Sequence, residues 1–369
     1  MAKQRVGILT GGGDAPGLNA VIRGVTKSAT NEYGMEVLGF HDGFLGLIEG
    51  RFDILTDKSV SGILTQGGTI LGTSNKADPY NHWVIDGNER KKMDVSNQCM
   101  QLYHDLGLTA LICLGGDGTM SIAGRLAEKG ANVVGVPKTI DKDVVGTDVT
   151  FGFDTARNMA TEAIDRLHTT ADSHHRVMLV EVMGRNAGWL ALESGIAGGG
   201  DIVLIPEIPY DMDVVLGAVR KRNRFGKRFS IVVVAEGAKP LGGVQTVRQI
   251  VADSPDPIRF GGVCYTIAAQ IEKDTGIECR ATVLGHLQRG GTPTPFDRLL
   301  ATQFAVKAVQ MVVAGEFNRM AAVQGSTLTT VPIASVVGQQ RKIPLDSQLI
   351  DVAYAVGTCL GANVRGTSS

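Results

Sequence analysis

The chain is poor in aromatic residues, lacks paired cysteines and carries almost no net charge. Aromatic residues make up 5% of its 369 residues whereas 48 are glycine, which favours an α/β protein with many tight strand-to-helix turns over an all-β protein. The five cysteines are scattered without a CxxC pair, so neither a zinc site nor a disulfide framework is indicated. The net charge of -1 gives no bias towards nucleic acid or an anionic membrane.

Long apolar runs are also missing. No stretch of about 18 apolar residues occurs, and the start of the chain, MAKQRVGILTGGG, lacks the apolar core of a signal peptide. We therefore expect a cytoplasmic protein with neither a nucleic-acid nor a membrane partner. The chain is longer than one ordinary domain, so two α/β lobes are predicted.

The first glycine-rich turn follows a predicted strand at residues 5–10. Its sequence, GGGDAPG at residues 11–17, leads into a predicted helix at residues 18–30. Backbone N–H groups at such a helix start can approach a phosphate, although a tight turn without a ligand is the alternative. The turn also matches the dinucleotide pattern GxGxxG. No acidic residue ends the next strand, however, which argues against a dehydrogenase.

A second turn, GGDGT, follows the predicted strand at residues 110–114, and a helix is expected from Met120 onwards. Its glycines allow a phosphate chain to come close, and Asp117 can bind the Mg²⁺ that accompanies such phosphates. Gly118 has no side chain that would project towards bound phosphates. The pattern indicates a nucleotide kinase, and a purely structural turn is the alternative.

Polar loops separate these elements. Residues 66–75, QGGTILGTSN, suit contact with a polyphosphate through backbone amides, with Asn75 and Lys76 as side-chain donors. The polar segment 79–96 and the proline-containing segment 239–261 read as insertions at the surface.

A group of carboxylates follows the apolar run at residues 133–136. Asp141, Asp143 and Asp148 are separated from it mainly by proline, lysine, threonine and glycine. Such a run is typical of a buried parallel strand, whose C-terminal end faces the ligand crevice of an α/β sheet. The group is therefore a metal and acid/base site or, alternatively, a solvated loop.

The second half of the chain offers basic groups beside predicted strand ends. Arg185 lies in a turn that is expected to begin a helix after the strand at residues 177–182, and an arginine there opposes the helix dipole unless an anion is bound. Arg280, His286 and Arg289 lie within ten positions of one another and suit a sugar phosphate. A core histidine with surface arginines is the alternative.

The order of these motifs resembles that of the 6-phosphofructokinase family over nearly the whole chain. The matching stretches are GGGDAPGLNAVIRG, GGTILGTSN, LGGDGT, PKTIDKD, GTDVTFGFDTA, VEVMGR, AEGA and RATVLGHLQRGG. The resemblance implies a cytoplasmic glycolytic kinase that transfers the γ-phosphoryl group of ATP to the 1-hydroxyl of fructose 6-phosphate, giving fructose 1,6-bisphosphate and ADP.

The resemblance also implies the architecture. It predicts two similar Rossmann-like lobes, each a mainly parallel sheet between helices, with the active site in the cleft. Residues 1–152 plus about 289–338 would form the nucleotide-binding lobe, and residues 153–288 plus about 339–369 the fructose 6-phosphate-binding lobe. A homotetramer, or a homodimer, is expected.

Site residues carried over by position form three sets. The nucleotide set is Gly13, Asn75, Lys76, Gly116, Asp117, Gly118 and Thr119, with Mg²⁺ on Asp117. The sugar-phosphate set is Thr139, Asp141, Arg176, Met183, Gly184, Arg185, Glu236, Arg280, His286 and Arg289, with Arg176 and Arg280 reaching a neighbouring subunit's site. The catalytic set is Asp141 as general base, with Arg185 and Lys138 against the transferring phosphoryl group.

Departures from the family pattern concern the phosphoryl donor. Members that use ATP commonly have glycine in place of Lys138 and arginine in place of Asn75, and the lysine is characteristic of the pyrophosphate-using branch. That branch usually carries aspartate at the Gly118 position, where a carboxylate would exclude the α-phosphate of ATP by bulk and repulsion. Lys138 does not exclude ATP from the site, so the glycine at position 118 favours ATP as the phosphoryl donor. A pyrophosphate-dependent fructose 6-phosphate 1-phosphotransferase is the alternative.

Other departures concern charge and regulation. Lys142 replaces a usual asparagine and could lower the pKa values of the neighbouring aspartates. The effector site of bacterial relatives is lined by arginines; here Arg23 is present, but Lys27 and His168 stand at two positions where arginine is common. We expect weakened control by nucleotide diphosphate or phosphoenolpyruvate, unless the basic tract at residues 221–228 supplies the missing charge.

Two further classes of function fit the sequence less well. A non-catalytic sugar-phosphate sensor on the same fold would have no need of a general base, so the presence of Asp141 together with Asp117 and Arg185 argues against it. Another GGDGT kinase, acting on NAD or lipid, is disfavoured by the PKTIDKD loop and by the sugar-phosphate arginines.

Overall fold

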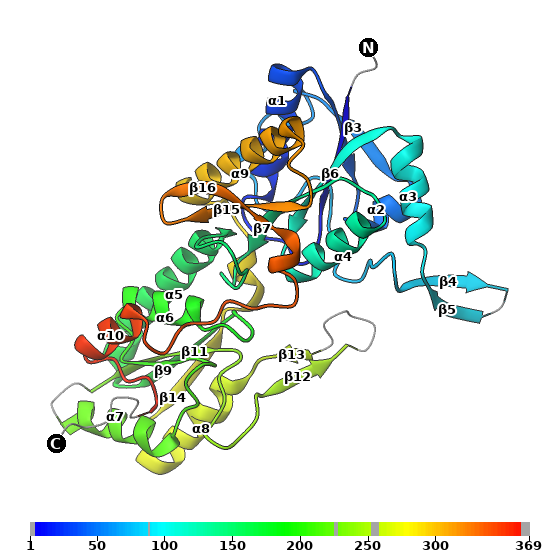
Figure 1. The fold of residues 1–369 in the computed structure, drawn as a ribbon. Helices are drawn as coiled ribbons and strands as arrows, with labels where there is room; N and C mark the ends of the chain where they lie inside the picture. Colours follow the sequence, from blue (N-terminus) through cyan, green and yellow to red (C-terminus); the bar gives the residue numbers. More distant parts are fainter. Residues whose placement is uncertain (1–3, 88, 225–227, 252–257, 363–369) are drawn as a thin grey trace.

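The computed structural model describes residues 4–87, 89–224, 228–251 and 258–362 and shows two α/β lobes (Figure 1). Each lobe is a mainly parallel sheet covered by helices on both faces. The α/β prediction is thus confirmed. Within the described residues, no helix is long and apolar enough to span a bilayer.

The first lobe is built on an eight-stranded sheet in the order β16-β15-β7-β6-β1-β2-β3, with the short β8 paired to β7. Neighbouring strands run parallel except at the pairs β2–β3 and β15–β16. The strands are β1 (Arg5–Thr10), β2 (Glu36–Phe40), β3 (Phe52–Leu55), β6 (Leu108–Gly115), β7 (Val133–Thr139), β8 (Phe151–Gly152), β15 (Arg319–Gln324) and β16 (Thr327–Pro332).

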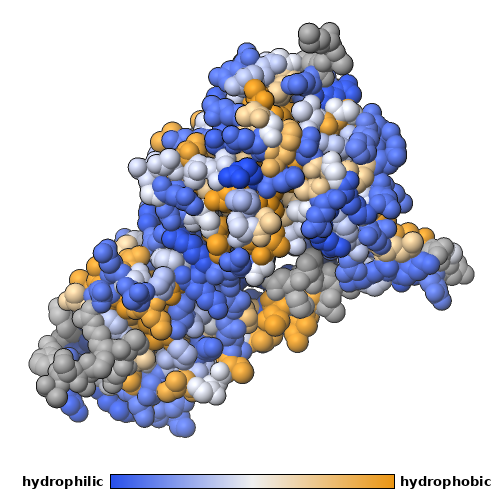
Figure 2. Space-filling view, in the orientation of Figure 1, coloured by the Kyte–Doolittle hydropathy of each residue, from blue (hydrophilic) through white to orange (hydrophobic). Residues whose placement is uncertain are grey.

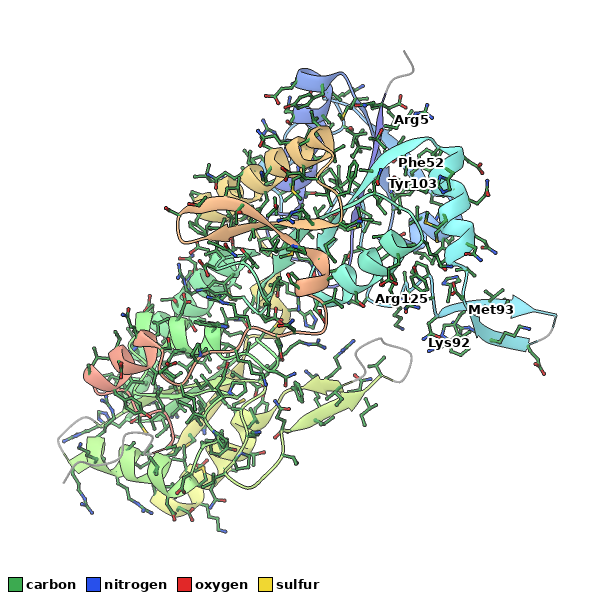
Figure 3. The ribbon with its side chains drawn as sticks, in the orientation of Figure 1. Arg5, Phe52, Lys92, Met93, Tyr103 and Arg125 are labelled. Atoms are coloured by element: carbon green, nitrogen blue, oxygen red, sulfur yellow. The ribbon has the colours of Figure 1, made fainter. Side chains whose placement is uncertain are left out.

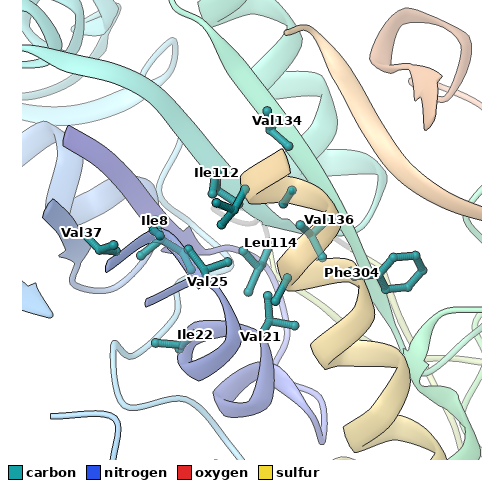
Figure 4. Close-up of a cluster of buried hydrophobic side chains, with 14 of the residues drawn as sticks. Ile8, Val21, Ile22, Val25, Val37, Ile112, Leu114, Val134, Val136 and Phe304 are labelled. Carbon is teal, nitrogen blue, oxygen red and sulfur yellow. The ribbon is translucent and has the colours of Figure 1, made fainter. Parts of the chain in front are cut away.

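Two helix layers cover this sheet. One face packs against α1 (Leu18–Tyr33) and α9 (Pro295–Ala314), and the other against α2 (Phe44–Glu49), α3 (Ser96–Asp105) and α4 (Asp117–Glu128). The buried strand residues alternate between the two cores, because successive side chains of a strand point to opposite faces. In Figure 4, Val21 and Val25 of α1 and Phe304 of α9 lie near Ile112 and Val136 of the sheet.

The second lobe has a fully parallel sheet in the order β10-β11-β9-β14. Helices α5, α6 and α10 cover one face, and α7 and α8 cover the other. The strands are β9 (Val177–Val182), β10 (Ile202–Leu204), β11 (Ser230–Ala235) and β14 (Cys279–Val283); the helices are α5 (Phe153–His174), α6 (Trp189–Ala197), α7 (Met212–Arg224), α8 (Val263–Thr275) and α10 (Gln348–Ala355).

Short 3-10 turns and two hairpins complete the described chain. The turns are η1 (Ile63–Thr65), η2 (Gly285–Arg289) and η3 (Ile333–Ser335). The hairpins β4 (His82–Asp86) with β5 (Glu89–Met93) and β12 (Val247–Ile250) with β13 (Ile258–Phe260) occupy the two segments predicted as surface insertions. Both project from the lobes, and Figure 3 shows Lys92 and Met93 on the first of them, with Arg125 of α4 near its base.

Several predicted boundaries differ from the observed ones. The helix after GGDGT begins at Asp117 rather than Met120. The apolar spacing of residues 350–360 predicts a last amphipathic helix over this segment, but α10 ends at Ala355. Leu360 is buried all the same, because an isolated bridge joins Cys359 to Ile202 at the edge of the second sheet. The apolar spacing therefore predicts correctly that Leu360 is buried, but it does not predict that the helix ends before this residue.

Candidate active site

Glycine-rich loops meet at the carboxyl ends of β1 and β6. Gly11 N donates to the carbonyl of Leu114 at 2.8 Å, and Gly12 N donates to the carbonyl of Ser74 at 3.2 Å. Thr73 Oγ1 donates to the Gly12 carbonyl at 2.6 Å. These bonds bring the loop at residues 66–75 onto the first glycine-rich turn, as expected at the ligand edge of a parallel sheet.

The GGDGT turn contributes the N-terminus of α4. Asp117, Gly118 and Thr119 form its first turn, and its N-cap residue, Gly116, makes no side-chain capping bond, so backbone N–H groups face outwards. A Cβ built on Gly118 would meet nothing within 4 Å, whereas one on Gly115 would lie 2.1 Å from Thr119 Oγ1. Gly115 is thus required by packing, while Gly118 leaves open space beside the helix start.

Asp117 lies close to other acidic and polar groups at this edge. Its Oδ1 accepts a hydrogen bond from Gly338 N at 2.7 Å. Burial, followed by the charge of Asp143, raises the pKa of Asp117, while the Gly338 N–H opposes the shift. Mg²⁺ is usually bound through one or two carboxylates together with substrate phosphates, and the neighbouring Asp117 and Asp143 fit that requirement.

Lys138 reaches the same place from β7. Its side chain is buried, and its Nζ donates to the carbonyl of Gly13. Burial, together with the charge of Arg289, lowers the pKa of Lys138 to about 8, and Asp141 opposes the shift. A buried ammonium beside a glycine-rich turn provides positive charge where phosphate would lie.

Asp141 is the most unusual carboxylate of the site. It is 5% exposed, and its Oδ1 has no hydrogen-bond partner among the described residues. Burial raises the pKa of Asp141 from 3.8 to about 6; Asp143 adds to the shift, and Arg289, Arg185 and Lys138 oppose it. A carboxylate with a raised pKa and an open oxygen suits a general base.

Polar partners orient the carboxylate loop. Thr139 Oγ1 accepts from Asp141 N at 3.0 Å and donates to Asp143 Oδ1 at 3.1 Å. Gln340 Nε2 donates to Asp143 Oδ2 at 3.1 Å, and Arg341 N donates to the Asp143 carbonyl at 2.8 Å. No sequence motif marks Gln340, which lies about 200 positions later in the chain.

The second lobe supplies the turn after β9. Arg185 N donates to Glu236 Oε1 at 3.1 Å, and Met183 N donates to Gln288 Oε1 at 2.8 Å. Gly184 has a φ of 135°, and a Cβ there would lie 2.6 Å from the Ala187 carbonyl, so glycine is required. The prediction that Arg185 begins a helix was wrong.

Arg185 instead lies before α6, with a φ of 52°, and that helix starts at Trp189. The helix-dipole argument therefore does not apply to it. Arg185 still belongs to the site by charge, because its guanidinium opposes the raised pKa of Asp141 across the two lobes.

Glu236 of the second lobe interacts electrostatically with Asp141 of the first lobe. Burial raises the pKa of Glu236 to about 7; Asp141 adds to this shift, and the Arg185 N–H opposes it. A carboxyl group with this pKa is partly protonated near neutral pH and can donate as well as accept a hydrogen bond. Glu236 at the end of β11 thus faces the same space as Asp141 at the end of β7.

Turn η2 completes this meeting point. Arg289 Nη1 donates to the carbonyl of Asp14 at 2.8 Å, and a Cβ on Gly13 would lie 2.8 Å from the same nitrogen. Gly13 therefore allows the arginine of one lobe to approach the backbone of the other. His286 lies on the same turn and lines an open surface cavity of about 720 Å³.

Comparison with known proteins agrees with this geometry. The family model described as Phosphofructokinase matches residues 5–312. The chain belongs to the phosphofructokinase family. It is 50% identical over 359 residues to ATP-dependent 6-phosphofructokinase 2 of Clostridium perfringens, covering 96% of this chain and 97% of the relative. It is 49% identical to an ATP-dependent 6-phosphofructokinase of Spirochaeta thermophila, covering 98% and 99%.

Solved structures show the same fold. Pichia pastoris phosphofructokinase in the T-state superposes with a TM-score of 0.77 at 30% identity; the match covers 96% of this chain but 36% of the larger yeast chain. A pyrophosphate-dependent phosphofructokinase from Marinobacter aquaeolei superposes with a TM-score of 0.79 at 20% identity, covering 97% and 88%. At that identity the second match bears on the fold alone.

Not all residues suggested by the family resemblance lie at this meeting point. Arg176 immediately precedes β9, whereas Met183 follows its other end, about 20 Å away at about 3.3 Å per residue. Arg176 binds both oxygens of Glu278, at 2.6 and 3.1 Å, and Arg280 pairs with the same carboxylate. Asn75 is exposed on the loop beside Ser74, as is Lys76.

The side chain of Lys142 pairs with Glu193 rather than with the neighbouring aspartates. Its Nζ lies 2.6 Å from Glu193 Oε1, and it stands over the rings of Phe153 and Trp189 at 4.9 and 5.0 Å. The pKa of Asp141 is raised rather than lowered, and Lys142 is not among the charges that oppose the shift. Lys142 therefore links the loop that carries Asp141 and Asp143 to α5 and α6 of the second lobe.

The suspected effector positions are occupied by internal contacts. Lys27 pairs with Asp57 at 2.9 Å, and His168 Nε2 lies 2.7 Å from the carbonyl of Gly198. In the basic tract at 221–228, Arg222 pairs with Asp201 at 2.7 Å, and residues 225–227 lie outside the described part of the chain.

Proposed function

We propose that this protein is an ATP-dependent 6-phosphofructokinase, which transfers the γ-phosphoryl group of ATP to the 1-hydroxyl of fructose 6-phosphate in glycolysis, in the cytoplasm. The observation that carries the proposal is the buried Asp141, whose pKa is raised mainly by burial while positive charges from both lobes, Lys138 and Arg185, oppose the shift. The names of the relatives at about 50% identity support the same activity.

On the nucleotide side, the proposal assigns phosphate binding to backbone N–H groups and nearby donors of the first lobe. The residues are Gly13, Asn75, Lys76, Gly116, Asp117, Gly118 and Thr119. Asp117 would hold Mg²⁺ with Asp143 nearby, and the ion would neutralise charge on the phosphates. Lys138 adds a buried positive charge beside Gly13.

On the sugar side, the proposal gives Asp141 the task of accepting the proton of the 1-hydroxyl as that oxygen attacks the phosphoryl group. Arg185 stabilises the charge of the transferring group, a role that dominates in phosphoryl transfer. Thr139, by its bonds to Asp141 and Asp143, orients the base. The sugar phosphate itself would contact Met183, Gly184, Glu236, His286 and Arg289.

Arg176 and Arg280 enter the proposal through a second copy of the chain. Both lie at the end of the second sheet that is remote from Met183, and this position supports a role in the site of a neighbouring molecule. The exposed apolar side chains of hairpin β12–β13, namely Val247, Ile250 and Ile258, offer further surface for such an assembly. Figure 2 shows an apolar patch in this region of an otherwise mostly hydrophilic face. We infer a homo-oligomer, a homotetramer or a homodimer, with shared sugar-phosphate sites.

The lobe boundaries form part of the same proposal. Residues 1–152 with about 289–338 constitute the nucleotide-binding lobe, and residues 153–288 with about 339–369 the sugar-phosphate-binding lobe. The membership of β15 and β16 in the first sheet and the packing of α10 in the second lobe support this division up to residue 362.

The choice between ATP and pyrophosphate can be tested at Gly118. Because a Cβ at this position meets no protein atom within 4 Å, Gly118→Asp and its control Gly118→Ala should both fold. Each protein is assayed with fructose 6-phosphate, Mg²⁺ and either ATP or pyrophosphate. We expect native protein and Gly118→Ala to use ATP, and Gly118→Asp to lose ATP use while still binding fructose 6-phosphate. Faster turnover of pyrophosphate than of ATP by the native protein would contradict the proposal.

A further inference from the structure

A buried carboxylate outside the proposed active site joins the two lobes. Asp297, in the first turn of α9, is fully buried, and its Oδ2 accepts hydrogen bonds from Thr155 N at 2.8 Å and Thr155 Oγ1 at 2.6 Å. Thr155 lies in the first turn of α5, 142 positions earlier. Since α9 packs on the first sheet and α5 on the second, these bonds cross between lobes.

The two helix starts are joined by hydrogen bonds. Gly152, the N-cap residue of α5, makes no side-chain capping bond, so Asp297 supplies a cap from the other helix. In the other direction, the N–H of Thr294, the N-cap residue of α9, donates to Thr155 Oγ1 at 3.0 Å. The hydroxyl of Thr294 donates to Asp154 Oδ2 at 2.7 Å. We call Asp154, Thr155, Thr294 and Asp297 the crossover clasp.

The crossover clasp lies where the chain passes between lobes in both directions. On one side, α5 follows β8 directly, and β8 pairs with the segment Lys138–Thr139 that leads to Asp141. On the other side, Thr294 follows Arg289 of η2 by five positions. The clasp therefore connects the base-bearing strand with the turn that reaches Asp14 from the second lobe.

Burying this carboxylate has a cost that packing alone does not require. Burial raises the pKa of Asp297 to about 6, while the hydrogen bonds from Thr155 oppose the shift. Burying a carboxylate without an ion-pair partner costs stability. Such a carboxylate is retained where its hydrogen bonds fix a particular geometry. The N-terminus of a helix is a favourable location for it, because the helix dipole is positive there.

We propose that Asp297 is a positioning residue for phosphoryl transfer: through the crossover clasp it sets the spacing between Asp141 of the first lobe and the sugar-phosphate groups of the second. This inference rests on the site assignment proposed above. Each substrate binds mainly to groups of one lobe, whereas transfer requires both lobes in register. A displacement of about 1 Å between reacting groups can cost about 100-fold in rate.

The test is Thr155→Val, which keeps the shape of the side chain and removes the hydroxyl that joins Asp297 to Thr294. We expect kcat to fall about 10- to 100-fold while the dissociation constants of ATP and of fructose 6-phosphate, each measured alone, stay within about twofold. Thr155→Ser, which retains the hydroxyl, should restore kcat. Asp297→Asn, which preserves the side-chain shape but removes the charge, should lower kcat in the same way and serves if Thr155→Val does not fold.

A matched control separates positioning from general stability. Thr26→Val removes a buried hydroxyl bond of the same kind, from Thr26 Oγ1 to the Ile22 carbonyl at 2.8 Å, but within α1 of a single lobe. It should keep the native kcat. Native kcat in folded Thr155→Val, or an equal loss in Thr26→Val, would overturn the inference. If the native protein failed to phosphorylate fructose 6-phosphate, the proposed function itself would fail.

Discussion

Replacing Asp141 with asparagine should abolish most activity and yet stabilise the protein, in a manner that depends on pH. The folded pKa of Asp141, about 6, exceeds its ordinary value of 3.8, so the folded state binds this proton more tightly than the unfolded state. Ionising the buried carboxyl therefore costs stability at high pH. Two pKa units correspond to about 3 kcal/mol, a cost that is complete above pH 6 and absent below pH 3.8.

The expected difference between Asp141→Asn and native protein follows from these two pKa values. Relative to its effect at pH 3, the substitution should raise the free energy of unfolding by about 3 kcal/mol at pH 8 and by about half as much at pH 5. Expressing each stability difference relative to that at pH 3 removes the pH-independent effect of placing a buried amide where the carboxyl group was. Denaturant titrations of both proteins at the three pH values measure the change.

The same variant tests catalysis. Loss of the base should lower kcat by about 10²- to 10⁴-fold with little change in substrate dissociation constants. In the native protein, kcat/KM should fall as the pH drops below about 6, because the base must be ionised to accept a proton.

Asp148→Asn provides the control on the same loop. Its side chain is 52% exposed, and we expect no loss of kcat. A stability difference for Asp141→Asn that does not vary with pH would refute the argument from burial. An Asp141→Asn protein that kept most of its kcat would remove this residue from the mechanism.

Three further predictions concern assembly, regulation and the turn after β9. Inactive Asp141→Ser and Arg176→Ala proteins, dissociated and reassembled together, should regain some activity, since a hybrid interface can contain one intact site; verified hybrids without activity would count against shared sites. Because Lys27 and His168 are engaged in internal contacts, we expect ADP and phosphoenolpyruvate to shift the fructose 6-phosphate saturation curve only slightly at pH 8. A large shift of the same size at pH 8 and at pH 6.5 would disprove the weakened effector pocket. Gly184→Ala should lower activity at least 10-fold, since its Cβ would lie 2.6 Å from a backbone carbonyl and its φ of 135° disfavours any side chain; activity assays on folded protein measure this.

Much of the architecture and the candidate site could be predicted because the relevant signals are local. Apolar runs ending in glycine-rich turns marked β1, β6 and β9, and an apolar run ending in a carboxylate-bearing loop marked β7; parallel strands necessarily bring their carboxyl ends to one edge of a sheet. The order of motifs then indicated the family, and the family comparison agreed. Helix starts were less accurate, because glycine and aspartate in GGDGT are poor helix formers that tertiary contacts place in the first turn of α4.

Contacts across space could not be read along the chain. The sequence placed Lys142 between two aspartates, but its ammonium turns to Glu193, 51 positions away. The pKa of Asp141 is raised by burial between two lobes, and the shift is opposed by Arg289 and Arg185, which lie 148 and 44 positions later in the chain. Thr294 and Asp297 have the spacing of a helix start, but the capping of α5 by Asp297 appears only once α9 packs beside it. Local patterns specify elements and their ends, whereas desolvation and charge interactions depend on distances that exist only in the folded chain.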